Sequence, residues 1–455
     1  MRHTVAATLA VLTFPFIAAA QSDSTPATPL AAGRPLRAVT ETVILNVAVN
    51  RTDAWVFGHD WAHSGTRTWG RNLRVGWEWD EDQFGTNLMM HPYHGGLYFN
   101  TARSNGLSFW EAAPVAFLGS WTWEYFGETD RPSLNDFFMT SFGGIALGEM
   151  FHRLGATIRD NGSPHRVWRE IAAFPLDPMG WVNRPRGRNA TLANPPEHAP
   201  GALSLRLHGG ARFVVDSRLH MAHGTPSLLV DFGYGDPFLQ PYRAPFDAFR
   251  VRAVLGDRGL NALRATGRLY GPRTQHRHLF LVNQRFDYVN NSAYRVGGQS
   301  IEGGLESHFP LPSGWQLRTE AYLDAILMGG VDATTAGFGK RDYDFGPGGG
   351  VRFRVEFGKR GWSYFAFSAE SDYIHAVSGA SADHFLGFGG FEITLPLGSA
   401  IGLTIHNTTF LRRSVNSDRP DEFRRFPELR IFLSWTDVRW ARPGGRLPQP
   451  TATAP

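Results

Sequence analysis

The chain has 455 residues, and its 45 Lys and Arg against 41 Asp and Glu give a formal net charge of only +4. This balance excludes a nucleic-acid binder that relies on a basic surface. The absence of cysteine excludes disulfides, thiolate metal sites and cysteine nucleophiles. The 13% of aromatic residues exclude a disordered chain.

Residues 1–20 have the pattern of a secretory signal peptide. A short basic start precedes an apolar run from Val5 to Phe16, and three alanines at 18–20 supply a cleavage site before Gln21. We expect the mature protein to begin at Gln21 and residues 21–36, rich in Ser, Thr, Pro and Ala, to form a linker. Because no later stretch is apolar enough for a spanning helix, an exported protein without a helical anchor is predicted.

Residues 37–193 are predicted to form a mainly α-helical domain. Ser108 and Glu111 form a capping box at the start of a helix over 108–126, and Ser133 is expected to cap a second helix over 133–153. Pro92 is expected to keep the residues around it off a regular helix. Each of the two helices carries a stripe of small residues, so they are expected to pack closely as an antiparallel hairpin. The stripes are Ala112, Ala116 and Gly119 on the first helix and Ser141, Gly144 and Gly148 on the second.

Residues 201–440, which follow a proline-rich linker at 194–200, alternate apolar and polar residues with period two. Leu317, Ala321 and Leu323, for example, alternate with Arg318 and Glu320. About twelve such segments of about 10–15 residues can be counted, which is the length and pattern of outer-membrane strands.

The lengths of the connections predict which side each one faces. The connections at 311–314, 358–361 and 396–399 are short and are expected to be periplasmic turns. Those at 328–343, 375–384 and 413–425 are long and polar and are expected to face outward. One connection on the periplasmic side, 235–245, is longer than this rule expects.

The polar face of these segments carries ionisable residues of both signs. In a soluble sandwich this face would meet solvent, whereas in a membrane barrel it lines the lumen, where opposite charges can pair. We predict an all-β transmembrane barrel of about 12 antiparallel strands, preceded by a mainly α-helical region (α+β overall) and followed by a disordered tail at 441–455. The lumen residues include Arg250, Arg252, Arg264, Arg268, Arg285, Asp287, Glu302, Glu306, Arg318, Glu320, Asp324, Arg352, Arg354, Glu356 and Glu392.

A set of short motifs in the helical region resembles one bacterial envelope family, which is catalogued as domain of unknown function three-nine-four-three. The resemblance covers roughly residues 40–190. It implies an exported envelope protein with a β-rich C-terminal part, and it implies no catalytic role. The motifs include His91-Pro92-Tyr93-His94-Gly95, Tyr98-Phe99-Asn100, Trp123-Glu124-Tyr125, Pro132-Ser133-Leu134-Asn135-Asp136 and Gly144-Ile145-Ala146-Leu147-Gly148-Glu149.

Two histidines, an arginine and four carboxylates of this region are the candidate functional residues. Carboxylates beside apolar helix faces are expected to be partly buried and to need partners, for which Arg103 and Arg153 are the candidates. The group is then either a structural salt-bridge network or a set of catalytic acids and bases. Glu149 and His152 have the Glu-x-x-His spacing of di-iron bundles, but only one copy is present where two are needed, so no metal site and no cofactor are assigned. The candidates are His91, His94, Arg103, Glu124, Glu128, Asp136 and Glu149.

The sequence leaves two functions open. The first is a structural or transport role for an outer-membrane barrel whose helical region plugs the lumen or caps its periplasmic mouth. The second is an outer-membrane enzyme that acts on lipid, lipopolysaccharide or glycan through His91, His94 and Glu124. No Gly-x-Ser-x-Gly elbow or phosphate loop supports the enzyme, and a sealed cluster would favour the structural role. The expected partners are outer-membrane lipids, lipopolysaccharide and the barrel-assembly machinery, with no nucleic acid; the sequence leaves the oligomeric state open.

Overall fold

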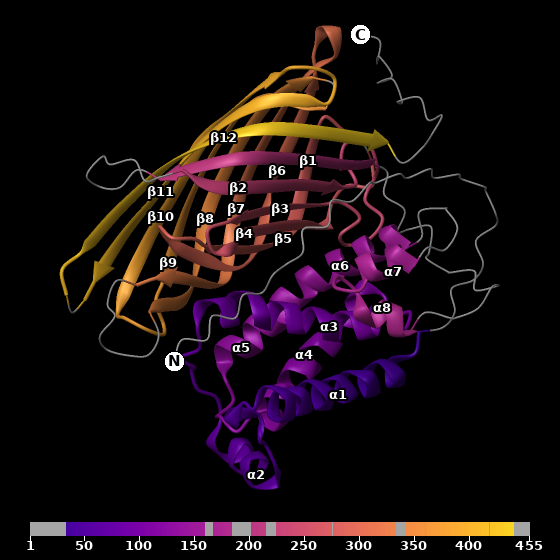
Figure 1. Cartoon of the computed structure of the whole chain (residues 1–455), viewed down its shortest axis with the longest axis vertical. Helices are drawn as coiled ribbons and strands as arrows, with labels where there is room; N and C mark the ends of the chain where they lie inside the picture. Colours follow the sequence, from indigo (N-terminus) through magenta and orange to yellow (C-terminus); the bar gives the residue numbers. More distant parts are fainter. Residues whose placement is uncertain are drawn as a thin grey trace.

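The computed structural model describes residues 33–159, 167–183, 202–214, 224–274, 276–333, 342–359, 361–417 and 419–440. The predicted signal peptide, the proline-rich linker and the C-terminal tail lie outside these residues. Within them, a helical region is followed by strands that close into a barrel (Figure 1). No helix in the described part of the chain is both long and apolar enough to cross a membrane.

Two of the helices begin directly after the predicted capping residues, Ser108 and Ser133. Ser108 Oγ accepts a hydrogen bond from the backbone N–H of Glu111, whose carboxylate accepts one from the backbone N–H of Ser108 at 2.8 Å. Ser133 Oγ accepts from the backbone N–H of Asp136 at 3.2 Å. The helices are α1 (Pro35–Thr52), α2 (Thr66–Val75), α3 (His91–Ser104), α4 (Phe109–Phe126), α5 (Leu134–Phe138), α6 (Gly144–Arg159), α7 (Val167–Ala173) and α8 (Pro178–Asn183), with π-helical turns at Asp53–Phe57, Thr86–Met90 and Met139–Gly143.

The prediction that Pro92 prevents a regular helix is wrong. Pro92 stands in the first turn of α3, where a missing N–H costs nothing because the first N–H groups of a helix have no partner within it. His91 and His94 are therefore three residues apart on one helix.

The segment predicted as the second helix does pack against α4, where the Phe117 ring lies 5.8 Å from the ring of Phe137 and 5.2 Å from that of Phe142. The prediction that the two small-residue stripes face each other is wrong. Gly144 of α6 lies against Gly95 of α3, so that a Cβ on Gly144 would be 2.5 Å from Gly95 Cα. On α4, a Cβ on Gly119 would be 2.5 Å from the Tyr98 ring of α3. Both stripes thus face α3, which the sequence did not predict as a helix.

Twelve antiparallel strands form the barrel, as predicted, and β1 pairs with β12 to close it. The connections predicted to face outward are shorter than expected, because the flanking strands extend into them. The strands are β1 (Ala202–Val214), β2 (Thr225–Tyr234), β3 (Phe249–Gly256), β4 (Gly259–Tyr270), β5 (His278–Asn290), β6 (Arg295–Pro310), β7 (Trp315–Asp332), β8 (Tyr343–Lys359), β9 (Trp362–His375), β10 (Ala382–Pro396), β11 (Ile401–Asn416) and β12 (Glu422–Trp440).

The two faces of the wall have opposite character. Ion pairs join Arg252 of β3 to Glu392 of β10 at 2.8 Å, and Arg264 of β4 to Glu370 of β9 at 3.0 Å. Strands so far apart in the sheet can share contacts only through the lumen, so the charged face points inward. The outward face is apolar, which makes this a barrel of the outer-membrane type. Its large exposed apolar residues on β7–β12 include Leu323, Val351, Phe353, Phe365, Phe367, Phe391, Ile393, Leu403, Ile405, Ile431, Leu433 and Trp435.

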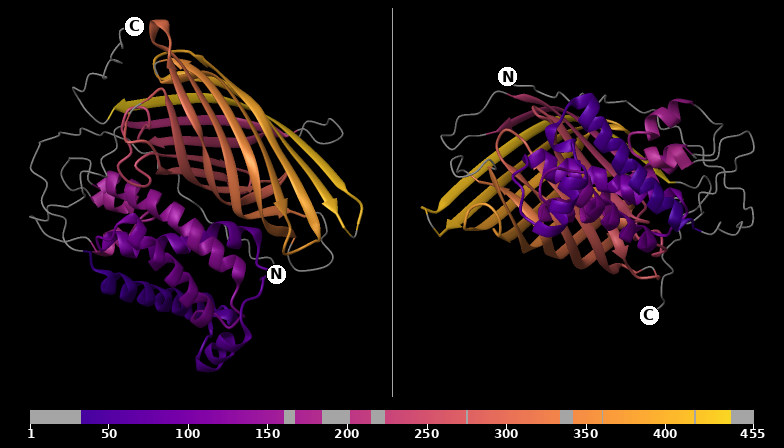
Figure 2. Two further views of the ribbon diagram at one scale, coloured as in Figure 1. Left: turned by 180° about the vertical axis from the view of Figure 1, so that it is seen from behind. Right: turned by 90° about the horizontal axis from the view of Figure 1, so that it is seen from below.

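The described helices lie against the outside of the wall and not in the lumen (Figures 1 and 2). On β5, Gln284 and Phe286 alternate with the inward-facing Arg285, and the Gln284 side chain donates to the carbonyl of Phe142 at 2.8 Å. The plug hypothesis is therefore wrong for these helices. Period two identifies an apolar outer face, but it does not say whether lipid or protein covers that face. The wall residues that share one hydrophobic core with α3, α4 and α6 are Tyr234, Phe249, Leu263, Ala265, Phe286, Tyr288, Met328, Tyr343 and Phe345.

The long connection between β2 and β3 has a structural explanation. Asp236 pairs with the inward-facing Arg318 at 2.6 Å. Phe238 packs against Leu279, Leu281 and Tyr322, which also point inward. The extra residues of this connection therefore fold into the mouth of the barrel at the end where both chain termini of the sheet lie.

We expect single cysteines to report the orientation of the barrel, because the natural chain has none. Ser417→Cys, in the β11–β12 connection, should react with a membrane-impermeant maleimide on intact cells. Ser399→Cys, in the β10–β11 turn, should react only after the cells are permeabilised, since it lies at the opposite end of the strands. Both serines are exposed, so accessibility within the protein is matched. The reverse labelling pattern would contradict the predicted orientation.

Candidate functional site

The seven candidate residues separate into two groups. The first is centred on Glu149 of α6, which is fully buried between two arginines. Its carboxylate is 2.7 Å from Nε of Arg103 and 2.7 Å from Nε of Arg153. Arg153 also donates to the carbonyl of Pro245 at 2.8 Å, which ties α6 to the barrel. Both arginines expected to serve the cluster are thus used by one carboxylate, in a structural role.

His152 does not join Glu149 in a metal-binding pair. Its Nδ1 lies 3.3 Å from the Asp177 carboxylate, which Arg159 also approaches at 3.0 Å. Glu149 and His152 therefore bind different partners, and their Glu-x-x-His spacing has no common ligand position.

The second group lies where the start of α3, the end of α4 and the start of α5 meet. His91, Glu124 and Asp136 each offer one ligand atom, and the three atoms lie within 4.8 Å of one another. The separation between His91 Nε2 and Asp136 Oδ1 is 3.5 Å. All three residues are buried, with Glu124 only 1% exposed. We call this group the acid–histidine cluster.

Each residue of the acid–histidine cluster is held by a further contact. His91 Nδ1 is 3.1 Å from Thr140 Oγ1. The backbone N–H of Ser133 donates to Glu124 Oε2 at 2.8 Å, and the side-chain amide of Asn135 donates to Asp136 Oδ1 at 3.1 Å. The other Glu124 oxygen, Oε1, is buried and has no hydrogen-bond partner among the described residues.

The two remaining candidates border this cluster. Trp123 Nε1 donates to Glu128 Oε1 at 2.6 Å. His94 lies edge-on to the same indole, with ring centroids 4.8 Å apart. Asp80, which the sequence did not identify, hydrogen-bonds through its carboxylate to the amides of Asn87 and Asn135.

Burial dominates the acid–base properties of these groups. Burial and the nearby charge of Glu128 raise the pKa of Glu124 well above its usual range, and burial raises the pKa of Glu128 to about 8. Burial and the charge of Asp80 raise the pKa of Asp136 well above its usual range. Burial lowers the pKa of His91 to about 4 and that of His94 to about 3, so both rings are neutral at pH 7.

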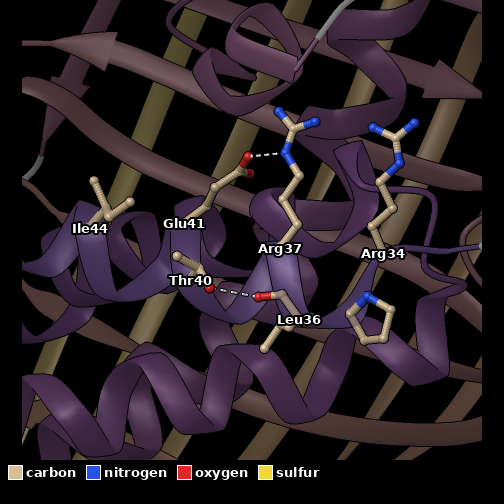
Figure 3. A pocket seen from close by; sticks show the side chains of 7 residues that line it. Arg34, Leu36, Arg37, Thr40, Glu41 and Ile44 are labelled. Carbon is tan, nitrogen blue, oxygen red and sulfur yellow. Dashed lines mark hydrogen bonds and ion pairs between the residues drawn. The ribbon is translucent and has the colours of Figure 1, made fainter.

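A surface groove of about 650 Å³ runs along α1 and offers no comparable chemistry (Figure 3). Its lining includes the ion pair of Arg37 with Glu41 at 2.7 Å and the apolar side chains of Leu36 and Ile44. The helix beneath it has reversed polarity: the buried residues are Ala38, Thr42, Asn46 and Asn50, and the exposed ones include Leu36, Val43, Ile44 and Val47.

Comparison with known families confirms the resemblance inferred from the motifs. Residues 76–179 match the family described as a domain of unknown function (DUF3943). The match contains all seven candidate residues and lies within the helical region. No protein with a curated description matches the chain.

Similar solved structures include outer-membrane proteins, and the similarity covers about half of this chain. OpdK from Pseudomonas aeruginosa, solved with vanillate, is 9% identical, with 52% of this chain and 99% of that chain covered and a TM-score of 0.20. OpdO from Pseudomonas aeruginosa is 12% identical, with 53% and 99% covered and a TM-score of 0.20. Neisserial surface protein A is 11% identical, with 51% and 96% covered and a TM-score of 0.17. The assignment as a barrel follows from the closed order of the twelve strands and from the opposite character of the two faces of the wall.

Proposed function

We propose that the protein is a non-conducting outer-membrane barrel with a structural role, which anchors in the outer membrane the helical domain docked on its outer wall. The observation that carries this proposal is a layer of ion pairs across the lumen. Besides the pairs of Arg252 and Arg264, Arg206 of β1 reaches Glu356 of β8 at 3.3 Å. These side chains occupy the path that a solute would have to follow.

Both ends of the lumen support the same proposal. At one end, Asp236 and Phe238 of the β2–β3 connection fold into the mouth. At the other, inward-facing aromatic rings pack together, with Tyr294 and Phe410 stacked at a centroid distance of 4.1 Å and Phe388 at 4.8 Å from Phe410. The cavity between these rings and the ion-pair layer has a volume of about 30 Å³, which is room for about two water molecules.

The enzymatic alternative finds less support. A reaction on lipid, lipopolysaccharide or glycan needs the substrate to reach His91 and Glu124, which are 8% and 1% exposed. The cluster is therefore closed to a substrate in the arrangement described here, which is what a structural or ion-binding role requires.

The proposal predicts that the folded protein does not conduct ions. Full-length protein reconstituted into planar bilayers should give no steps of current above the empty bilayer, because charged side chains and aromatic rings fill the lumen. An open porin inserted at the same protein-to-lipid ratio serves as the positive control. The amount of inserted barrel can be measured by its heat-dependent mobility on a gel. Steady single-channel currents from the wild-type protein would contradict the proposal.

A further inference from the structure

The acid–histidine cluster has the dimensions of a metal site. The 3.5 Å between His91 Nε2 and Asp136 Oδ1 is long for a hydrogen bond. Two ligand atoms that are each about 2.1 Å from a tetrahedral Zn²⁺ ion lie about 3.4 Å from each other. One ligand atom from each of His91, Glu124 and Asp136 lies within 4.8 Å of the other two, so the three residues are close enough to share one ion.

The contacts around the three residues orient them as metal ligands are oriented in proteins. A histidine that binds a metal through Nε2 donates its Nδ1–H to a neighbouring oxygen, and Thr140 Oγ1 is in place to accept from His91 Nδ1. The Ser133 backbone N–H and the Asn135 side chain hold one oxygen each of Glu124 and Asp136. These contacts leave Glu124 Oε1 buried without a partner in the described part of the chain.

The acid–histidine cluster also has no arginine or lysine in contact with its carboxyl groups among the described residues. None of the ion pairs of the described residues joins Glu124, Glu128 or Asp136 to an arginine or lysine. Buried charges in proteins are normally paired with an opposite charge or bound to a metal.

A second acidic group in the barrel lumen makes the contrast clear. Asp324, Glu370 and Asp372 also lie close enough together to share an ion. In that group, however, Arg285 is 3.1 Å from Asp324, and Arg264 is 3.0 Å from Glu370. Arginine already supplies the positive charge in the lumen, whereas the acid–histidine cluster has only carboxylates and neutral donors.

We propose that His91, Glu124 and Asp136 bind one divalent transition-metal ion, for which Zn²⁺ is the best match. An imidazole nitrogen with two carboxylate oxygens suits Zn²⁺ better than Mg²⁺ or Ca²⁺, which prefer oxygen ligands alone. The ion would link α3, α4 and α5 and neutralise their buried carboxylates. This site is independent of the proposed anchoring role and of whether the barrel conducts.

The test uses full-length protein in detergent, stripped with a chelator and dialysed against Zn²⁺. Wild-type protein should retain one Zn²⁺ per chain by elemental analysis, and Zn²⁺ should raise its unfolding temperature. Glu124→Gln, which keeps the shape of the side chain, should lose both effects. Thr140→Val removes the partner of His91 Nδ1 and should weaken Zn²⁺ binding by about 10- to 100-fold.

Glu128→Gln is the matched control, because Glu128 is a half-buried carboxylate four residues after Glu124, just beyond the end of α4, and it is held by Trp123. It should keep one Zn²⁺ per chain. Folding of every variant is checked by the heat-dependent mobility of the barrel, and if Glu124→Gln does not fold, Thr140→Val decides. The proposal is overturned if folded wild-type protein retains no Zn²⁺, or if Thr140→Val binds Zn²⁺ as tightly as the wild type.

Discussion

Glu149→Gln should destabilise the helical region by about 3–5 kcal/mol, because it leaves two buried arginines without their carboxylate. Arg153 is 1% exposed and the side chain of Arg103 is 8% exposed, so water is a poor replacement for the Glu149 carboxylate at both guanidinium groups. The expected result is a lower unfolding temperature of the purified protein in detergent, together with faster proteolysis within α3 and α6.

Glu78→Gln is the control for this substitution. Glu78 pairs with Arg131 at 2.9 Å, but the two side chains are 36% and 46% exposed. A pair on the surface contributes about 0–1 kcal/mol, so its loss should be close to neutral. If the two substitutions had equal effects, Glu149 would not be the structural centre that its contacts indicate.

Gly95→Ala should separate α3 from α6 even though it adds only one carbon atom. A Cβ at this position would be 1.8 Å from the backbone carbonyl oxygen of Thr140. A backbone atom cannot rotate away as a side chain can, so the helices must move apart, and overpacking of this kind typically costs about 1–3 kcal/mol or more. Protease sensitivity across residues 91–159 should rise, while the heat-dependent mobility of the barrel should remain.

Gly70→Ala provides the matched control within the same region. Gly70 is inside α2, and a Cβ there would meet no atom within 4 Å. Alanine is a better helix former than glycine by roughly 0.5–1 kcal/mol, so this variant should be as stable as the wild type or more so. Equal damage from both substitutions would show that α3 and α6 are not in the close contact described.

The barrel was largely predictable from the sequence because its signals are local. Strand alternation with period two assigns each side chain to one face, and the closed sheet of β1–β12 has those faces where the pattern placed them. The capping box of Ser108 and Glu111 spans only four residues, so it too could be predicted without knowing the rest of the fold.

What covers each face could not be predicted, because it depends on contacts between distant parts of the chain. The apolar outer face of β5 looks the same in sequence whether it meets lipid or, as Phe286 does, the helical region. In the same way, the sequence identified Arg103 and Arg153 as partners for buried carboxylates, but it could not show that both bind Glu149.

The acid–histidine cluster illustrates the same limit within one region. His91, Glu124 and Asp136 were identified by residue type, but their proximity depends on the packing of three helices. No sequence pattern marks Thr140 as a partner of His91. The presence of Pro92 led to the wrong prediction that His91 does not lie on a helix. Because proline is tolerated in the first turn of a helix, a helix that begins at His91 is compatible with Pro92.

The reversed polarity of α1 bears on whether the helical region can exist apart from the barrel. The buried side of α1 is polar, and its asparagine side chains bind the neighbouring backbone. Asn46 donates to the carbonyl of Gly119, and Asn50 donates to those of Ala62 and Gly127. A fragment that ended before β1 would therefore expose two apolar surfaces to water, the outer side of α1 and the side of α3, α4 and α6 that covers the wall. The change in sequence pattern after residue 193 marks a change of secondary structure, but it does not mark a point where the protein can be cut into two soluble halves.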